Sequence, residues 1–530
     1  MIGSSFSLSV LMISFNRCRD SLAHFMCVAC ISMTASVAHA EVRLPTFFAD
    51  HAVLQRDRPV PIWGWAEAGE SVAVSLGKER AEATADKDGR WKVVLKAQPV
   101  SKAPLELIVA GKNRIVVKDV LLGDVWLCSG QSNMSISLGG FTALPEVKLD
   151  IAKAEFPLIR QFGVLEHFAD EPQTDVKGEW LVCSPRTSSR FAAVAYYFAR
   201  KLHAETGVPI GILRAAKGST RIESWLSQET LLNTKELEPY SKTMRESLDQ
   251  WEKAKQAAMT AGIQPGTAEF PLYPFGEKAR KPRCVTLHNG MIAPLAPYAI
   301  RGAVWYQGEG NAGDPKTAQE YVVRLRTLIR DWRTLFGDET LPVYIVQLPA
   351  YREPNESPES AESLAFLRES QRQCLKLPNT GMAVTIDIGE AGDIHPKNKI
   401  DVGDRLAQLA LAADKKIVPC GPLFRDLRFD GNKAIVEFDH IGNGLMVGFK
   451  DGLKRVAEAK GTALTRFAIA GKDKKWFWAE AKIDGKTVTC SHAEVPNPVA
   501  VRYAFSANPS GANLYNRDGF PASPFRSDDW

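Results

Sequence analysis

Between residues 121 and 415, short apolar runs alternate with longer segments of helical periodicity. The apolar runs, which we expect to form strands, are Val125–Cys128, Val208–Leu213, Ala299–Tyr306, Val343–Leu348 and Met382–Ile388. Between them, apolar residues recur at helical spacing, as in Tyr321, Leu325, Leu328 and Trp332, and further helices are expected over 190–204, 361–376 and 398–413. Strands that alternate with helices predict an α/β fold with a mostly parallel sheet.

The segments on either side read as all-β. Residues 41–120 contain Ser71–Leu76 and Trp91–Leu95, with Asp88-Gly89 predicting a hairpin turn before the second run. Residues 416–530 contain similar short runs, Ala434–Phe438 and Val499–Tyr503. We therefore expect an N-terminal β-sandwich (41–120), a catalytic α/β domain (121–415) with an insertion at 232–282, and a C-terminal β-sandwich (416–530).

The first forty residues resemble an export signal. Arg17 and Arg19 precede an apolar stretch over 25–37, and Ala38-His39-Ala40 matches the A-x-A cleavage pattern. The positive charges lie deep in the segment, so Met12 is an alternative start. This pattern predicts a secreted or periplasmic protein that begins at Glu41.

Charge and cysteine content narrow the function. The net charge is only +5 and no long basic run occurs, which gives no support to nucleic-acid binding. After residue 40 no segment approaches the roughly 18 consecutive apolar residues of a membrane span. Six of the nine cysteines follow residue 40, an even number that fits an exported protein, and no C-x-x-C pair predicts a zinc site there. We expect no metal.

Ser132 is the candidate nucleophile, because ligands of an open parallel sheet bind beyond the carboxyl ends of its strands. It follows the first predicted strand in Ser129-Gly130-Gln131-Ser132-Asn133-Met134, where Gly130 permits a tight turn. Backbone amides at the start of a following helix can stabilise a developing oxyanion. Met134 departs from G-x-S-x-G, which argues against an α/β-hydrolase elbow. The alternative is a Ser/Asn turn that caps a helix.

A serine nucleophile requires a base, and His395 follows the last predicted strand in Gly392-Asp393-Ile394-His395-Pro396. Asp393, two residues earlier, is placed to orient the imidazole and stabilise its protonated form. The alternative is a turn before a helix with the aspartate as its cap.

Two other strand ends carry polar groups that suit an oxyanion hole. One is Lys217-Gly218-Ser219-Thr220, and the other is Gln307-Gly308-Glu309-Gly310-Asn311. Each such donor contributes about 3 kcal/mol to transition-state stabilisation. Glycines also occur at strand ends for steric reasons alone.

Taken together, these motifs resemble the sialate O-acetylesterase family of the SGNH/GDSL hydrolase superfamily. The matching segments, in chain order, are Asp50–Arg56, Pro59–Trp65, Gly123–Met134, Ile222–Trp225, Asn289–Leu295, Trp305–Glu309, Asp393–Pro396 and Ala512–Asn516. They span nearly all of the chain after residue 40.

The resemblance implies a flavodoxin-like SGNH sheet and an acetyl-ester hydrolase without a cofactor, acting on an O-acetylated sugar or glycan. By position, Ser132 corresponds to the nucleophile, His395 to the general base, Asp393 to its partner and Gly218 to an oxyanion donor. The superfamily's third motif, G-x-N-D, is not matched, so Asn311, slightly favoured, or Gln307 is expected to supply the side-chain donor. Glu309 and Asn289 are candidate supporting residues.

Alternatives remain for both substrate and role. The same chemistry on plant cell-wall sugars, such as acetylated xylan, is the nearest alternative to a sialate ester. A non-catalytic carbohydrate-binding protein and a serine peptidase are rivals of other classes. Trp225, Tyr306 and the 232–282 insertion are expected to line a sugar mouth. The alternative for the two aromatic residues is burial in the core, and the alternative for the insertion is a plain surface excursion. Cys128 is expected to be a buried strand residue.

Overall fold

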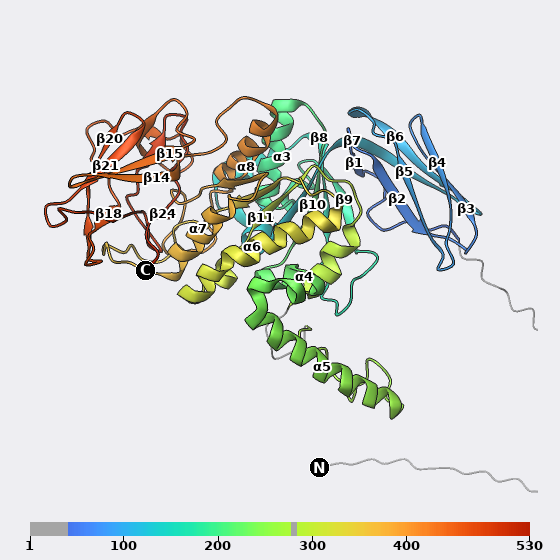
Figure 1. Ribbon diagram of the computed structural model, residues 1–530. Coiled ribbons are helices and arrows are strands. Elements are labelled where there is room, and N and C mark those ends of the chain that lie inside the picture. Colours follow the sequence, from blue (N-terminus) through green and yellow to red (C-terminus); the bar gives the residue numbers. More distant parts are fainter. Residues whose placement is uncertain (1–40, 277–283) are drawn as a thin grey trace, which may run out of the picture. The chain divides into compact units, whose positions relative to one another are not determined.

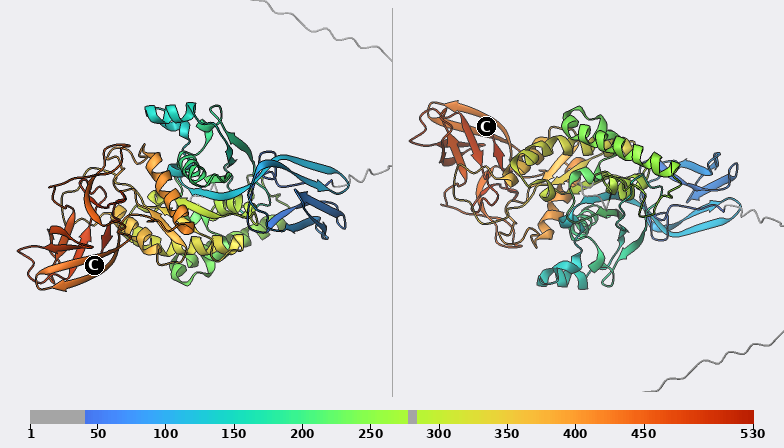
Figure 2. Two further views of the ribbon diagram at one scale, coloured as in Figure 1. Left: turned by 90° about the horizontal axis from the view of Figure 1, so that it is seen from above. Right: turned by 90° about the horizontal axis from the view of Figure 1, so that it is seen from below.

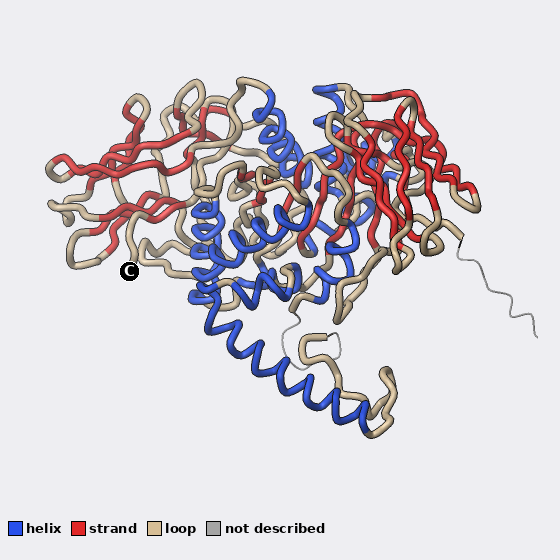
Figure 3. The backbone as a smooth tube through the Cα atoms, turned by 45° about the vertical axis from the view of Figure 1, so that its right-hand side comes forward, coloured by secondary structure: helices blue, strands red, loops and turns tan. Residues whose placement is uncertain are grey.

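The computed structural model describes residues 41–276 and 284–530. The expected export signal and residues 277–282 of the insertion therefore lie outside the described residues. Strands dominate both ends of the described chain, and most helices lie between residues 193 and 414, as Figure 3 shows by colour.

The central sheet runs in the order β13-β12-β11-β7-β10-β8-β9. Figure 1 labels its strands β7 to β11. All pairs from β13 to β8 are parallel, and β9 pairs antiparallel to β8. The strands are β7 (Arg114–Gly130), β8 (Phe156–Val164), β9 (Gly178–Cys183), β10 (Ile210–Ala216), β11 (Gly302–Tyr306), β12 (Val343–Val346) and β13 (Thr380–Ala383). The predicted α/β fold is confirmed, and each expected strand overlaps an observed one, although β13 ends at Ala383 and not at Ile388.

Without the β8–β9 pair, the strand order is 2-1-3-4-5, which is the flavodoxin-like order. In such a sheet the strands that follow the first strand are added first on one side of it and then on the other. Ligands bind at this topological switch point. Here the first strand is β7, which has β10 on one side and β11 on the other. The loop that follows β7 is therefore the expected place for a site.

Helices cover both faces of this sheet (Figure 2). Right-handed crossovers that run in opposite directions from β7 place their helices on opposite faces. Accordingly α3 packs against α8, and α6 packs against α7. The helices are α1 (Ser132–Ser135), α2 (Pro145–Ala152), α3 (Ala193–Thr206), α4 (Gln228–Asn233), α5 (Glu238–Thr260), α6 (Pro315–Phe336), α7 (Ser363–Cys374) and α8 (Lys399–Asp414).

Local sequence explains where the longer helices begin and end. At the start of α6 the carboxylate of Asp314 accepts the amide of Thr317 at 2.9 Å, and Pro315 occupies the first turn. Gly337 ends α6 in the left-handed region with φ 67°. Asn398 caps α8 by accepting the amide of Asp401 at 3.0 Å. Helix α5 makes up the charged part of the insertion (Figure 1).

The segment before the central sheet consists of strands, and the long strand β7 pairs with two of them before it enters the central sheet. These strands are β1 (Val53–Gln55), β2 (Val60–Trp65), β3 (Ser71–Leu76), β4 (Glu79–Thr84), β5 (Arg90–Leu95) and β6 (Ser101–Ala110). The turn at Asp88-Gly89 is present, with Gly89 at φ 73°, but the hairpin prediction is wrong. The turn joins strands of different sheets, because β4 pairs with β3 whereas β5 pairs with β2.

The C-terminal segment contains short antiparallel sheets around a separate apolar core. Its strands are β14 (Leu423–Asp430), β15 (Lys433–Asp439), β16 (Leu445–Phe449), β17 (Ala457–Glu458), β18 (Phe467–Ala470), β19 (Trp476–Trp478), β20 (Glu480–Asp484), β21 (Thr487–Ser491), β22 (Ala500–Tyr503), β23 (Leu514–Asn516) and β24 (Phe525–Arg526).

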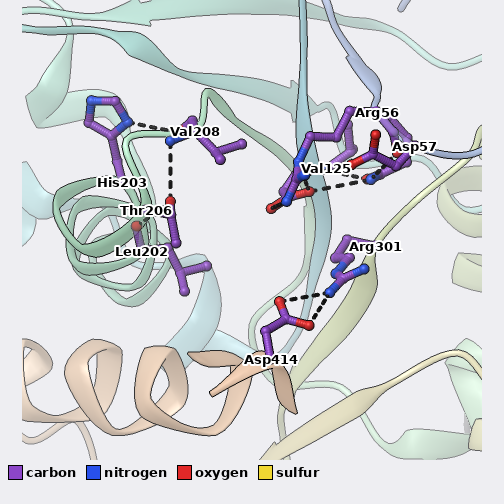
Figure 4. A network of polar contacts seen from close by, with 11 residues as sticks. Arg56, Asp57, Val125, Leu202, His203, Thr206, Val208, Arg301 and Asp414 are labelled. Atoms are coloured by element: carbon purple, nitrogen blue, oxygen red, sulfur yellow. Dashed lines mark hydrogen bonds and ion pairs between the residues drawn. The ribbon is translucent and has the colours of Figure 1, made fainter. Parts of the chain in front are cut away.

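Polar contacts stabilise the amino edge of the central sheet, where its strands begin (Figure 4). Ser132 follows β7 at the opposite, carboxyl edge. Arg301, just before β11, pairs with Asp414 at the end of α8, at 2.7 Å. The Nδ1 of His203 on α3 lies 2.7 Å from the carbonyl oxygen of Val208, just before β10. These contacts connect helix ends to strand starts at the amino edge. The candidate site lies at the carboxyl edge.

The six cysteines after residue 40 are all buried: Cys128, Cys183, Cys284, Cys374, Cys420 and Cys490. Cys128 is a fully buried residue of β7, and burial raises the pKa of its thiol, as expected for an unreactive core residue. Over the described ranges, no helix combines the length and the apolar character needed to cross a bilayer.

Candidate functional site

The turn that carries Ser132 is held against the end of the neighbouring strand β11. Gly130 has φ 141°, and a Cβ at that position would lie 2.1 Å from the carbonyl oxygen of Tyr306, so only glycine fits. Gln131 donates its amide to that same oxygen at 3.0 Å and accepts the amide of Gly310 through its side chain at 3.1 Å. The strand ends of β7 and β11 therefore fix the position of the next residue, Ser132.

His395 contacts Ser132, although the two residues lie near opposite ends of the α/β segment in the sequence. Its Nε2 lies 2.9 Å from the Ser132 Oγ. His395 follows the edge strand β13, which is three strand positions from β7, and each strand spacing is roughly 4.8 Å. The chain between β13 and α8 runs back across the carboxyl edge to close this gap. A serine hydroxyl and an imidazole at hydrogen-bond distance have the geometry expected of a nucleophile and its general base.

Asp393 approaches His395 in two ways. One carboxylate oxygen accepts the backbone amide of His395 at 2.8 Å and lies 3.6 Å from the ring Nδ1. The second distance exceeds a hydrogen bond but permits electrostatic orientation of the ring. The side chains of Asp393 and His395 are 43% and 34% exposed, so this pair borders an open site.

A buried polar network lies beneath the pair, and of its side chains only Glu309 was named from the sequence. Asn133, next to the candidate nucleophile, donates its side-chain amide to Glu309 at 2.6 Å and to the carbonyl oxygen of Ile394 at 3.0 Å. Its own oxygen accepts the ammonium of Lys399 from the first turn of α8. Asn133 thus bonds the residue beside Ser132 to the residue beside His395.

Burial shapes the charges in this network. It lowers the pKa of Lys399 to about 7 and raises the pKa of Glu309. The Lys399 ammonium also lies over the rings of Phe141 and Tyr306, at 5.4 and 5.5 Å from their centres. Burial, and then the positive charge of Lys399, lower the pKa of His395, while Asp393 opposes them. A lowered pKa keeps the imidazole neutral, and so able to accept a proton, at mildly acid pH.

Of the expected oxyanion donors, Gly218 lies beside Ser132. A Cβ built on Gly218 would lie 3.5 Å from the Cβ of Ser132. The loop that follows β10 thus brings its backbone to the nucleophile.

The expected side-chain donors do not fit this role. Gln307 is fully buried and donates both amide hydrogens within the core, to Thr220 O at 3.1 Å and to Asn311 Oδ1 at 2.9 Å. Asn311, also fully buried, donates to Glu223 at 3.0 Å and accepts the amide of Ile222 at 3.0 Å. Both amides brace the loops after β10 and β11 against one another.

The contacts and burial of the other predicted residues give each of them a structural role. Glu309 accepts Asn133 and so supports the nucleophile turn. Asn289 donates to the carbonyl oxygens of Ala169 and Asp170, and so holds the loop between β8 and β9. Trp225 and Tyr306 are fully buried, so the expectation that they line a sugar mouth is wrong and their core reading is correct. Among the described residues, no cluster of His, Cys, Asp or Glu has the arrangement of a metal site.

Comparison with known proteins identifies the family of this chain. The model of the family "carbohydrate esterase, sialic acid-specific acetylesterase" matches residues 122–261 and 285–412. Sialate O-acetylesterase from Mus musculus is 29% identical over 458 residues, 78% of this chain and 81% of that protein. The Rattus norvegicus enzyme is 30% identical over 426 residues, 72% of this chain and 76% of that protein.

A solved structure covers more of the chain. A carbohydrate acetylesterase from Xanthomonas citri is 38% identical, with a TM-score of 0.76, and the match covers 92% of this chain and 100% of that one. This chain is a carboxylic ester hydrolase that belongs to the carbohydrate esterase family of sialic acid-specific acetylesterases.

Proposed function

We propose that this protein is an exported carbohydrate O-acetylesterase in which Ser132 is the nucleophile, His395 the general base and Asp393 the partner of His395. The observation that carries the proposal is the 2.9 Å separation of Ser132 Oγ and His395 Nε2 at the switch point of the sheet. The catalytic part is an SGNH-type domain over 121–415, between β-sandwich domains at 41–120 and 416–530.

The reaction proceeds through an acetyl-enzyme. Ser132 Oγ attacks the acetyl carbonyl carbon while His395 Nε2 accepts its proton. The backbone amides of Ser132 and Gly218 stabilise the oxyanion. His395 then protonates the leaving sugar oxygen, which departs as the alcohol. A water molecule, deprotonated by His395, attacks the acetyl carbon and releases acetate and free Ser132.

The test compares wild type with Ser132→Ala on 4-nitrophenyl acetate, O-acetylated sialic acid and acetylated xylan. Wild type is expected to release acetate from at least one sugar ester, and Ser132→Ala is expected to lose this activity. Ser135→Ala, which removes a hydroxyl three residues later in α1, serves as the matched control and should retain it. Equal rates in wild type and Ser132→Ala would reject Ser132 as the nucleophile. Cleavage of casein in place of the esters would support a peptidase.

The names of the relatives specify the sugar to different degrees. The mouse and rat relatives carry the name sialate O-acetylesterase, whereas the more similar Xanthomonas structure is titled a carbohydrate acetylesterase. The substrate panel therefore includes both kinds of ester, and the ratio of the two kcat/KM values assigns the substrate.

Export rests on the Ala38-His39-Ala40 pattern. N-terminal sequencing of protein recovered outside the cytoplasm should begin at Glu41. Recovery of the uncleaved chain from the cytoplasm alone would contradict export.

A further inference from the structure

A cleft of about 830 Å³ lies between the loops that precede His395 and the C-terminal strands. One wall comes from the segment after β13, at Ile386, Asp387 and Gly389. The other comes from β16, β17 and the turn over residues 508–513. Nothing in the catalytic mechanism above uses this cleft.

The cleft adjoins the catalytic loop on both sides along the chain. Before the loop, Gly389 lines the cleft, and the next residue, Glu390, forms a β-bridge with Asp393. After the loop, Lys450 of the cleft pairs with Asp401 in the first turn of α8. A molecule in the cleft would therefore lie beside the segment that holds Asp393 and His395.

A second chain of hydrogen bonds links the cleft to the catalytic loop. Asn508 lines the cleft and donates its side-chain amide to the carbonyl oxygen of Arg352 at 2.6 Å. Arg352 in turn donates its amide to the carbonyl oxygen of Ala391 at 3.0 Å, within the catalytic loop. The cleft is thus a fixed neighbour of the site.

The charges that line the cleft are already paired. Asp387 forms two bonds with Arg405, at 2.6 and 2.8 Å, and Glu458 pairs with Arg517 at 2.9 Å. Lys450 pairs with Asp401, as described. Since every charged residue that lines the cleft has a partner of opposite sign, a charged ligand would gain little there, whereas a neutral, hydroxyl-rich ligand suits the polar walls.

One aromatic ring stands out at the cleft. Phe449, at the end of β16, is 62% exposed. An exposed phenyl ring beside hydrogen-bonding groups provides the surface on which the apolar face of a pyranose ring packs.

From this arrangement we infer that the cleft binds a neutral stretch of the glycan chain whose acetyl group lies at Ser132, with a sugar ring packed on Phe449. The inference rests on the proposed esterase function and extends it, because it requires an oligomeric or polymeric substrate.

The test uses Phe449→Ala in the full chain, with Phe429→Ala as the matched control. Phe429 is 45% exposed on β14 in the same C-terminal segment and does not line the cleft. On acetylated xylan, Phe449→Ala should raise KM about tenfold with little change in kcat, since the lost contact is remote from the reacting atoms. On 4-nitrophenyl acetate neither variant should differ from wild type. An unchanged KM on acetylated xylan in Phe449→Ala overturns the inference.

Calorimetric titration separates this inference from the proposed function, because it needs no catalysis. Unacetylated xylohexaose should bind wild type and Phe429→Ala equally, and should bind Phe449→Ala about tenfold more weakly. Absence of xylohexaose binding to wild type, or Phe449-dependent binding of sialyllactose in its place, overturns the inference even where 4-nitrophenyl acetate is hydrolysed. If wild type binds xylohexaose through Phe449 but hydrolyses no ester, the cleft stands and the esterase proposal falls.

Discussion

The Oγ of Ser132 lies 2.9 Å from the Nε2 of His395, although 263 positions separate the two residues in the chain. Strand β7 delivers the serine, and the loop between β13 and α8 returns the histidine to it. Convergence of a hydroxyl and an imidazole at the switch point of a parallel sheet is the structural basis of the proposed esterase chemistry.

Replacing His395 by Gln removes the proton acceptor and should lower kcat on 4-nitrophenyl acetate about 10²- to 10⁴-fold, the contribution typical of a general base. Because His395 is partly exposed, the melting temperature should change little. His492→Gln, at an imidazole stacked on Phe477 in the C-terminal segment, is the control and should retain full activity. Full activity in His395→Gln would remove His395 from the mechanism.

The dependence of kcat/KM on pH should reveal the charge on Lys399. His395 accepts a proton only as neutral imidazole, so activity rises as pH rises through its pKa. Burial and the Lys399 ammonium lower that pKa, and the acid limb should therefore lie below the usual value of about 6.5. Since burial lowers the pKa of Lys399 to about 7, this side chain is charged over that range.

Lys399→Met should raise the pKa of His395 and move the acid limb to higher pH. Glu309, Asp393 and Glu390, the carboxylates that also act on Lys399, remain in the variant. Lys397→Met, which removes a surface ammonium paired with Glu390, is the matched control and should leave the limb in place. A limb that stays in place in Lys399→Met as well would show that Lys399 has no electrostatic effect on the base.

Gly130→Ala should destabilise the protein, because a Cβ there would meet the Tyr306 carbonyl oxygen at 2.1 Å on a backbone with φ 141°. The expected loss is about 1–3 kcal/mol in the free energy of unfolding, measured by urea denaturation. Gly313→Ala is the control, since no atom lies within 4 Å of the added Cβ. Equal stability of the two variants would mean that the nucleophile turn relaxes freely.

Apolar runs predicted the strands that deliver Ser132 and His395, because the second half of β7 is largely buried and β13 ends in the buried residues Met382 and Ala383. The pair β8–β9 was missed, since polar Arg160 and Gln161 interrupt β8 and only tertiary contacts satisfy them. The hairpin at Asp88-Gly89 was wrong because a turn signal does not specify which sheet the next strand joins.

The side-chain donor of the oxyanion hole also could not be identified from the sequence. Gln307 and Asn311 follow a strand as an oxyanion donor should, but their amides are used in holding the loops together. No pattern in the sequence distinguishes an amide directed at substrate from one directed at a neighbouring loop. Asn133 lay within a recognised motif and Lys399 three residues beyond another, yet their contact depends on the same long-range closure that brings His395 to Ser132.

The most direct test of the nucleophile assignment is covalent labelling. A fluorophosphonate reacts with a serine that an adjacent base activates, and peptide mass spectrometry locates the adduct. We predict a single adduct on the peptide that contains Ser132, formed in wild type and lost in His395→Gln. An adduct on another serine, or an adduct on Ser132 that forms equally fast in His395→Gln, would contradict the Ser132–His395 pair.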